Sequence, residues 1–202
     1  FHARRGVVEV GRQTLPSGKT VTMRARRIEA CALFSPIASA APGAIARLLR
    51  ASYAELLRAD PRWTAEQASW DEYDREAFAN PGTVGACLFF TWLGDRVVGF
   101  ASWDPRPRPE YGIVGQNCIL PEFRKRGLGK RQVEEVLRRL RGLGIDRASV
   151  STADHPFFLP AQRTYLECGF REVNRAPWDR DPSVTTIEYV KRLDPSFALS
   201  LE

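Results

Sequence analysis

The stretch that decides the fold of this chain reads Arg124-Lys125-Arg126-Gly127-Leu128-Gly129-Lys130. It lies between an apolar segment, residues 111–120, and an amphipathic segment, residues 130–143. Glycines at the start of a helix let the backbone come close to a ligand and aim several N–H groups at one point. The partial positive charge of a helix N-terminus and the basic side chains attract an anion. The stretch therefore predicts a pyrophosphate-binding loop between a strand and a helix.

Other nucleotide-binding loops do not match this stretch. The P-loop pattern GxxxxGK[ST] is absent because Arg131 follows Lys130, and a dinucleotide GxGxxG pattern is absent as well. A helix start with glycines and surface arginines that binds no ligand would have the same appearance. The loop therefore has to be interpreted together with its neighbours.

Hydrophobic patterns around the loop predict a mixture of strands and helices. A hairpin with a Pro-Ser-Gly turn opens the chain, joining residues 7–10 to residues 20–23. Helical periodicity extends over residues 42–60, 64–78, 130–143 and 160–168. Strands are predicted over residues 86–92, 97–103, 111–120, 147–152, 170–174 and 185–193. Gly112 and Gly115 predict a bulge or a splay within one of these strands.

Two helices carry more detailed side-chain patterns. Residues 64–67, Thr-Ala-Glu-Gln, predict a capping box at the start of the second helix. On the helix over residues 130–143, the i,i+4 spacing predicts ion pairs between Glu134 and Arg138 and between Glu135 and Arg139. The outer face of this helix is therefore expected to be solvated and internally paired.

Composition narrows the class of protein. The chain has 202 residues and a formal net charge of +6, with only two histidines, His2 and His155. Its four cysteines are scattered without a CxxC pair, at Cys31, Cys87, Cys118 and Cys168. We expect no metal site and interpret these cysteines as reduced thiols of a cytoplasmic protein. No apolar run approaches the ~20 residues that cross a bilayer. The basic surplus alone fits a nucleic acid, an anionic small molecule or a well-solvated surface.

Two motifs in order make the interpretation specific. The loop matches (Gln/Arg)-x-x-Gly-x-(Gly/Ala) as Arg124-x-x-Gly127-x-Gly129, and residues 161–170 form a short helix pattern with a tyrosine that ends in Gly-Phe. Together they resemble the GNAT superfamily of acetyl-CoA-dependent N-acetyltransferases. The resemblance implies an α/β fold with a mixed, mostly antiparallel sheet of six to seven strands and helices on both faces. We expect an N-terminal hairpin extension over residues 1–25, packed on a GNAT domain over residues 26–200.

The resemblance also implies where acetyl-CoA binds. The strand before the loop would pair with the pantetheine arm through Cys118, Ile119 and Leu120. The pyrophosphate would be held by the loop itself, Arg124, Lys125, Arg126, Gly127, Leu128, Gly129 and Lys130. Many members bind the cofactor amide with an Asn near the position of Phe158, and here Gln162 or a backbone group would have to replace it.

The resemblance implies a general acid but leaves the general base open. Tyr165 occupies the position of the family's tyrosine, which would protonate the departing coenzyme A thiolate. The usual glutamate on the strand before the loop is absent from residues 112–117. Candidates for the general base are Glu110, water held by Asn117, or one of three further groups, Asp104, Asp154 and His155. A histidine before a proline is also typical of a capping or packing residue.

The function implied is transfer of an acetyl group to a primary amine by direct attack in a ternary complex. A small metabolite or an antibiotic-like amine is the favoured acceptor. The alternatives are a non-catalytic acyl-CoA-binding domain that acts as a sensor or scaffold, and a protein or peptide acetyltransferase.

The arginines gather at the loop and on an ion-paired helix, so we expect no nucleic acid and no membrane partner, and the family is compatible with a homodimer. Aromatic residues flank the expected acceptor side, namely Trp92, Trp103, Tyr111, Phe157 and Phe158.

Overall fold

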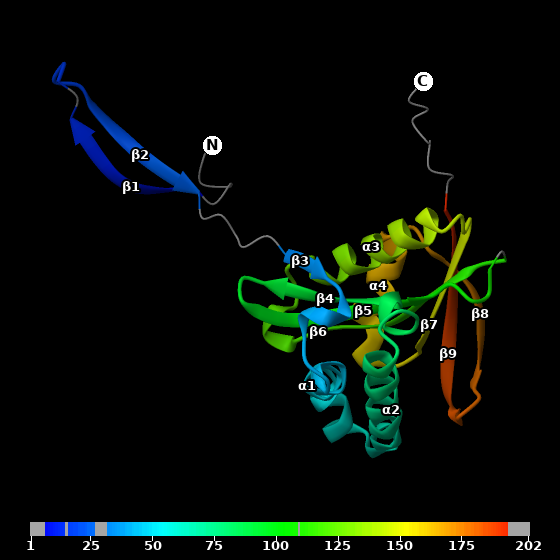
Figure 1. The fold of residues 1–202 in the computed structure, drawn as a ribbon. Coiled ribbons are helices and arrows are strands. Elements are labelled where there is room, and N and C mark those ends of the chain that lie inside the picture. The colour runs from blue at the N-terminus through cyan, green and yellow to red at the C-terminus, as the bar shows by residue number, and fades with distance from the viewer. Residues whose placement is uncertain (1–6, 15, 27–31, 109, 194–202) are drawn as a thin grey trace, which may run out of the picture. The chain divides into compact units, whose positions relative to one another are not determined.

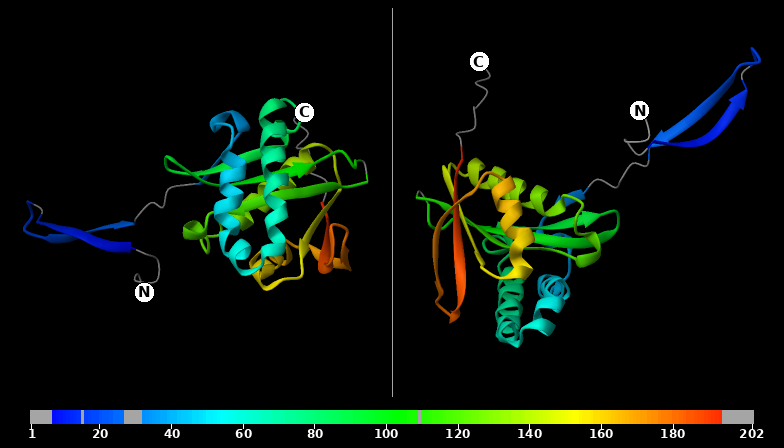
Figure 2. Two further views of the ribbon diagram at one scale, coloured as in Figure 1. Left: turned by 90° about the horizontal axis from the view of Figure 1, so that it is seen from below. Right: turned by 180° about the vertical axis from the view of Figure 1, so that it is seen from behind.

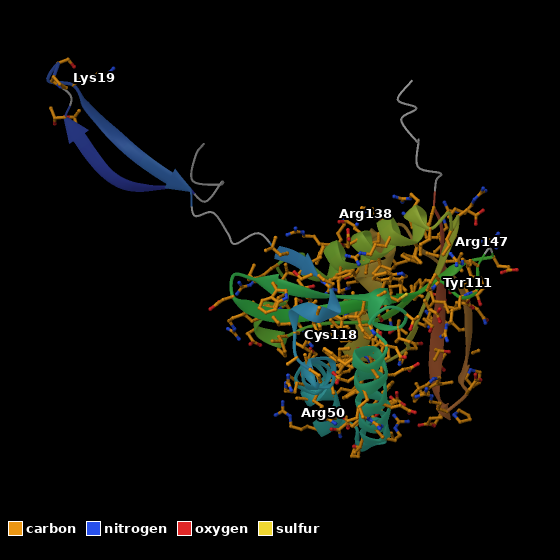
Figure 3. All side chains as sticks on the ribbon, in the orientation of Figure 1. Lys19, Arg50, Tyr111, Cys118, Arg138 and Arg147 are labelled. Atoms are coloured by element: carbon orange, nitrogen blue, oxygen red, sulfur yellow. The ribbon has the colours of Figure 1, made fainter. Side chains whose placement is uncertain are left out.

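The computed structural model describes residues 7–14, 16–26, 32–108 and 110–193, and the chain divides into two compact units, Phe1–Cys31 and Ala32–Glu202. In the first unit, β1 (Val7–Thr14) and β2 (Thr20–Arg26) form an antiparallel hairpin. Gly18 has a positive φ of 77° at the turn, beside Lys19, which Figure 3 labels at the tip. The hairpin is confirmed, whereas its packing on the larger unit stays a prediction.

The second unit is built on a seven-stranded sheet with the order β3-β4-β5-β6-β7-β9-β8 (Figure 1). Its strands are β3 (Ala32–Ser35), β4 (Leu88–Leu93), β5 (Arg96–Asp104), β6 (Gly112–Ile119), β7 (Arg147–Ala153), β8 (Arg171–Trp178) and β9 (Asp181–Arg192). All neighbouring strands pair antiparallel except β6 and β7, which pair parallel. The predicted fold class is confirmed. The short edge strand β3 was not predicted, because its four residues are too few to show a pattern.

Two helices cover each face of this sheet. Helices α1 (Ala44–Ala59) and α2 (Glu66–Ala79) lie together on one face, and α3 (Leu128–Gly142) and α4 (Leu159–Glu167) lie on the other (Figure 2). Alternation along β4 supplies both interfaces. Leu88 and Phe90 pack in the cluster with α1 and α2, while Phe89 between them packs in the cluster with α3.

Two local predictions are wrong. Thr64 caps no helix: it lies in a 3-10 turn (Pro61–Ala65) that Asp60 caps, and α2 begins at Glu66 without a side-chain cap. The reason is that Pro61 fixes the backbone one turn before the predicted start. The second error concerns the surface of α3.

The predicted pair between Glu134 and Arg138 is replaced by other pairs on α3. Glu135 accepts from both Arg138 and Arg139, at 2.7 and 2.8 Å, so the predicted pair of Glu135 with Arg139 is confirmed. Glu134 instead lies 3.9 Å from Lys130, one turn earlier. Arg138 therefore pairs at i,i+3 spacing, which a helix allows as readily as i,i+4.

A buried carboxylate holds the two helices of the first face together. Asp74 on α2 accepts hydrogen bonds from the backbone N–H groups of Gly43 and Ile45, at 2.6 and 2.8 Å, at the start of α1. These N–H groups have no partner within their own helix, so Asp74 caps α1 from outside. This contact anchors the start of α1, the helix that also carries Ser52 and Tyr53 of the site described below. No helix among the described ranges is long and apolar enough to cross a membrane.

Candidate active site

The parallel pair of strands at the centre of the sheet separates after a short contact. β6 and β7 pair only through Gly112 with Ala148 and Ile113 with Ser149, although both strands continue beyond these residues. On its other side β6 bulges against β5, where a Cβ on Gly115 would lie 2.5 Å from the Ser102 hydroxyl oxygen. The predicted bulge is confirmed. The edge of β6 that faces β7 is left without a strand partner over its second half.

A cavity of about 510 Å³, the loop cavity, lies where β6, the loop and α4 meet. It brings together ten of the predicted site residues, from three different elements. They are Asn117, Cys118, Ile119, Arg124, Lys125, Gly127, Leu128, Gly129, Lys130 and Tyr165. Leu120, Arg126 and Gln162 do not line it. Gln162 is buried and donates instead from Nε2 to the carbonyl oxygen of Ala153, at 3.1 Å.

The loop backbone has the shape that anion binding needs. Lys125 and Gly127 both have positive φ angles, of 59° and 75°, and α3 begins directly after them at Leu128. A left-handed lysine is unusual, and such backbone conformations concentrate at functional sites. The first N–H groups of α3 have no acceptor within the helix and carry its positive end. Lys125 and Lys130 add full charges to the same lining.

The side chain of Arg124 forms hydrogen bonds within the protein. Its Nη2 donates to the carbonyl oxygen of Ser52 on α1, at 2.6 Å, and its Nε donates to that of Ile119, at 3.2 Å. Its guanidinium also lies 5.7 Å from the centre of the Phe157 ring. The side chain therefore ties α1 to the end of β6. Arg126 extends along the outside, where its Nη2 donates to the Glu122 carbonyl oxygen at 3.3 Å.

Tyr165 and Asn117 meet at the inner end of the loop cavity. The Nδ2 of Asn117 donates to the Tyr165 hydroxyl oxygen, at 3.3 Å. Tyr165 is only 5% exposed. Burial raises the pKa of its hydroxyl, and the bond from Asn117 offsets part of this rise. Because the oxygen accepts this bond, the hydroxyl proton can point at a ligand.

A second cavity of about 370 Å³, the central cavity, adjoins this pair. The two cavities share five lining residues, namely Tyr53, Asn117, Phe158, Ala161 and Tyr165. A third cavity of about 890 Å³, the outer cavity, shares Glu66 and four further residues with the central one, namely Ile113, Gly115, Gln116 and Trp178. Asn117 and Tyr165 thus lie between a loop cavity on one side and two cavities on the other.

None of the four side chains considered as general bases lines the loop cavity or the central cavity. Glu110 is exposed and lines none of the three cavities. Asp104 lines the outer cavity, where hydrogen bonds from Arg106 lower the pKa of its carboxyl. Asp154 pairs with Arg175 at 2.6 Å. His155 caps a 3-10 turn by accepting from the Phe157 N–H at 3.1 Å, so its capping interpretation is confirmed.

Sequence reasoning missed the side chains that α1 and α2 bring to the site. Tyr53 lines both the loop and the central cavities and packs against Phe157 and Phe158, with ring centres 5.4 and 6.0 Å apart. In the sequence it is one apolar position of an amphipathic helix. Glu66 likewise is an ordinary acidic residue at a helix start. No local signal distinguishes either residue, because their role depends on which strand the helix crosses.

The aromatic residues predicted to flank the acceptor side lie in different parts of the structure. Phe157 and Phe158 line the loop cavity, and Trp103 lines the outer one. Trp92 instead packs in the core of the α1 and α2 face, and Tyr111 is an exposed residue. Further aromatic side chains line the central cavity, namely Trp63, Trp70 and Trp178.

Comparisons with known proteins agree with this architecture. A model described as the acetyltransferase (GNAT) family matches residues 50–170. A GNAT-family structure from Desulfovibrio desulfuricans has a TM-score of 0.64 at 19% identity, covering 81% of this chain and 99% of that chain. The IAA acetyltransferase from Bacillus cereus has a TM-score of 0.56 at 16% identity, covering 81% and 100%. Comparison with curated proteins gives no match. At these identities the structures show the fold alone.

Proposed function

We propose, since the chain belongs to the acetyltransferase (GNAT) family, that it transfers the acetyl group of acetyl-CoA to a primary amine of a small molecule. The observation that carries this proposal is the position of the Asn117–Tyr165 pair between the loop cavity and the central cavity. A thioester entering from one side and an amine entering from the other would meet there. Direct attack in a ternary complex is consistent with separate entrances for the thioester and the amine.

The loop cavity suits acetyl-CoA as co-substrate. Its loop supplies free N–H groups at a helix N-terminus together with Lys125 and Lys130, which match a pyrophosphate in charge and hydrogen bonding. The backbone of Cys118 and Ile119 lies on the half of β6 that has no partner in β7, and both residues line the cavity. That edge would accept an extended pantetheine arm as an added strand. Cys118, labelled in Figure 3, is itself buried, and its carbonyl oxygen accepts from Nε2 of Gln132 at 3.3 Å.

The chemistry requires one proton to be delivered and one to be removed. Acetyl-CoA supplies an acetyl group held as a thioester. The amine nitrogen bonds to the acetyl carbon as the carbon–sulfur bond breaks, and Tyr165 gives its hydroxyl proton to the departing sulfur. The raised pKa of Tyr165 keeps that proton in place at neutral pH. Asn117 orients the phenol and lies where it could hold a water that takes the proton of the amine.

The first test is calorimetric titration with acetyl-CoA of the wild type and of Gly129→Asp. A Cβ at Gly129 would have no atom within 4 Å, so the fold should tolerate the change while a carboxylate faces the pyrophosphate site. The matched control is Gly142→Asp at the other end of α3, where the surroundings are equally open. We expect micromolar binding in the wild type and the control, and its loss in Gly129→Asp. If the wild type does not bind acetyl-CoA, the proposal is wrong.

The second test is release of free coenzyme A thiol in the presence of a panel of primary amines. We expect turnover with at least one amine and none with the matching alcohols. Binding of acetyl-CoA without turnover of any amine would favour the non-catalytic alternative instead.

A further inference from the structure

The outer cavity differs in charge from the rest of the chain. The whole chain has a formal net charge of +6. The outer cavity is lined by four carboxylates, Glu66, Glu72, Glu76 and Asp104, against two guanidiniums, Arg106 and Arg180, which makes its lining net −2. It adjoins the central cavity on the side away from the basic loop. The two ends of the site therefore attract ligands of opposite charge.

Glu66 lies at the junction of the outer and central cavities. Among the described residues that line the central cavity it is the one carboxylate, and its side chain is 18% exposed. It accepts from Nη1 of Arg180 at 3.1 and 3.2 Å. Arg180 comes from the turn between β8 and β9, and its side chain is 63% exposed. The arginine is the exposed partner of this pair, so a ligand cation that keeps the carboxylate paired can take its place.

Aromatic rings line the same cavity as this carboxylate. Trp63 and Trp178 stack with ring centres 5.6 Å apart and an angle of 21° between their planes, and both line the central cavity with Glu66. Arg180 lies 5.9 Å from the centre of the Trp178 ring. A cation is attracted both by a carboxylate and by the face of an indole. The guanidinium of Arg180 already makes both contacts, which marks a position that suits a positively charged group.

We propose that the acetyl acceptor is a small alkyl diamine or polyamine whose second ammonium group displaces Arg180 and binds Glu66. This inference rests on the proposed function, because the reacting amine would lie beside Asn117 and Tyr165 in the same central cavity. An amine must be neutral to attack the thioester, so the cation held at Glu66 is a different group of the same molecule. Glu72 and Glu76, farther out on α2, would receive additional ammonium groups of a longer polyamine.

The test is calorimetric titration with 1,5-diaminopentane of the wild type, Glu66→Gln, Arg180→Met and a control, Glu122→Gln. Glu122 also pairs with an arginine, Arg96 at 3.3 Å, but lines none of the three cavities. We expect Glu66→Gln to weaken binding at least tenfold and Arg180→Met to tighten it several-fold, because the competing cation is gone. The control should bind as the wild type does. Equal binding by Glu66→Gln, weaker binding by Arg180→Met or no binding by the wild type would overturn the inference.

A kinetic experiment separates the contribution of the second charge from that of the reacting amine. With saturating acetyl-CoA, we expect kcat/KM for 1,5-diaminopentane to exceed that for 1-aminopentane at least tenfold in the wild type, and the difference to vanish in Glu66→Gln. Equal values in the wild type, or no turnover of the diamine, would overturn the inference. Titration of every variant with acetyl-CoA distinguishes the two proposals. If acetyl-CoA binds and the diamine results fail, only the acceptor class is wrong, whereas failure of acetyl-CoA to bind removes the proposed function itself.

Discussion

Asn117 on β6 donates a hydrogen bond to the hydroxyl oxygen of Tyr165 on α4, at 3.3 Å, across the opening between β6 and β7. The bond joins the strand that precedes the loop motif to the tyrosine of the second motif. It fixes the direction of the phenol and uses the oxygen as an acceptor, so the hydroxyl proton is left for another partner. This geometry is what a proton donor to a leaving group requires.

Replacing Tyr165 with Phe tests that role. The phenyl ring should keep the contacts with Phe170 and Tyr189, whose ring centres both lie 6.0 Å from that of Tyr165. We expect kcat for coenzyme A release to fall by roughly 10²–10⁴-fold, since that is what a general acid contributes. The affinity for acetyl-CoA should change little, as measured by calorimetry. An unchanged kcat would show that Tyr165 is a packing residue.

The sequence predicted the second unit well because its elements are signalled locally. The amphipathic period of α3 and the glycines around it gave the helix with errors of only one or two residues at its ends. Gly115 correctly indicated the bulge in β6. By contrast, Thr64 has a capping sequence but no helix to cap, because Asp60 and Pro61 start a 3-10 turn first. Local signals compete, and the sequence does not show which one prevails.

The site was predicted where its residues lie in or beside the two sequence motifs. The loop residues were found because they follow one another from Arg124 to Lys130, and ten predicted residues do line one cavity. Tyr53 and Glu66 were missed because their positions depend on how α1 and α2 cross the sheet. Arg124 was predicted to contact the cofactor, but its side chain contacts the protein. Its place in the motif implied a cofactor contact, while its guanidinium binds protein carbonyls from α1 and β6.

Asp74 should be among the side chains most important for stability. Asp74→Ala would leave the N–H groups of Gly43, Ile45 and Ala46 without the carboxylate that now accepts from all three, at 2.6, 2.8 and 3.3 Å. We expect the free energy of unfolding in urea to fall by about 1–3 kcal/mol, the usual cost of buried donors left unpaired. The matched control is Asp71→Ala on the same helix, which removes a half-exposed ion pair with Arg50. Equal losses in the two variants would contradict the capping role.

Cys118 should make the protein less stable at alkaline pH. Burial raises the pKa of its thiol from 9.0 to about 11. Below pH 9 both the folded and the unfolded chain keep this proton, so its contribution is constant. Between pH 9 and 11 the unfolded chain releases the proton while the folded chain keeps it, and the free energy of unfolding falls by up to about 1.4 kcal/mol per pH unit.

Urea unfolding of the wild type and Cys118→Ala at pH values from 8 to about 11 isolates this contribution. Other groups that titrate in this range, such as Tyr189, contribute equally to both proteins, except Tyr53, whose pKa the ionised Cys118 thiol also raises. The difference in free energy of unfolding between wild type and variant should therefore shrink as the pH rises. A difference that stays constant would mean that the folded chain ionises Cys118 as easily as the unfolded chain does.

Arg124→Lys should weaken both the fold and the binding of acetyl-CoA. The guanidinium reaches two carbonyl oxygens at once, that of Ser52 at 2.6 Å and that of Ile119 at 3.2 Å, and a single ammonium cannot reproduce this fork. We expect a loss of about 1–2 kcal/mol in the free energy of unfolding, the cost of one or two charged hydrogen bonds. The affinity for acetyl-CoA should fall several-fold because the end of β6 is no longer held. Arg126→Lys is the control, since its side chain contacts the Glu122 carbonyl oxygen and the Phe123 ring and lines none of the three cavities. If both variants retain wild-type stability and affinity, the link between α1 and β6 does not organise the site.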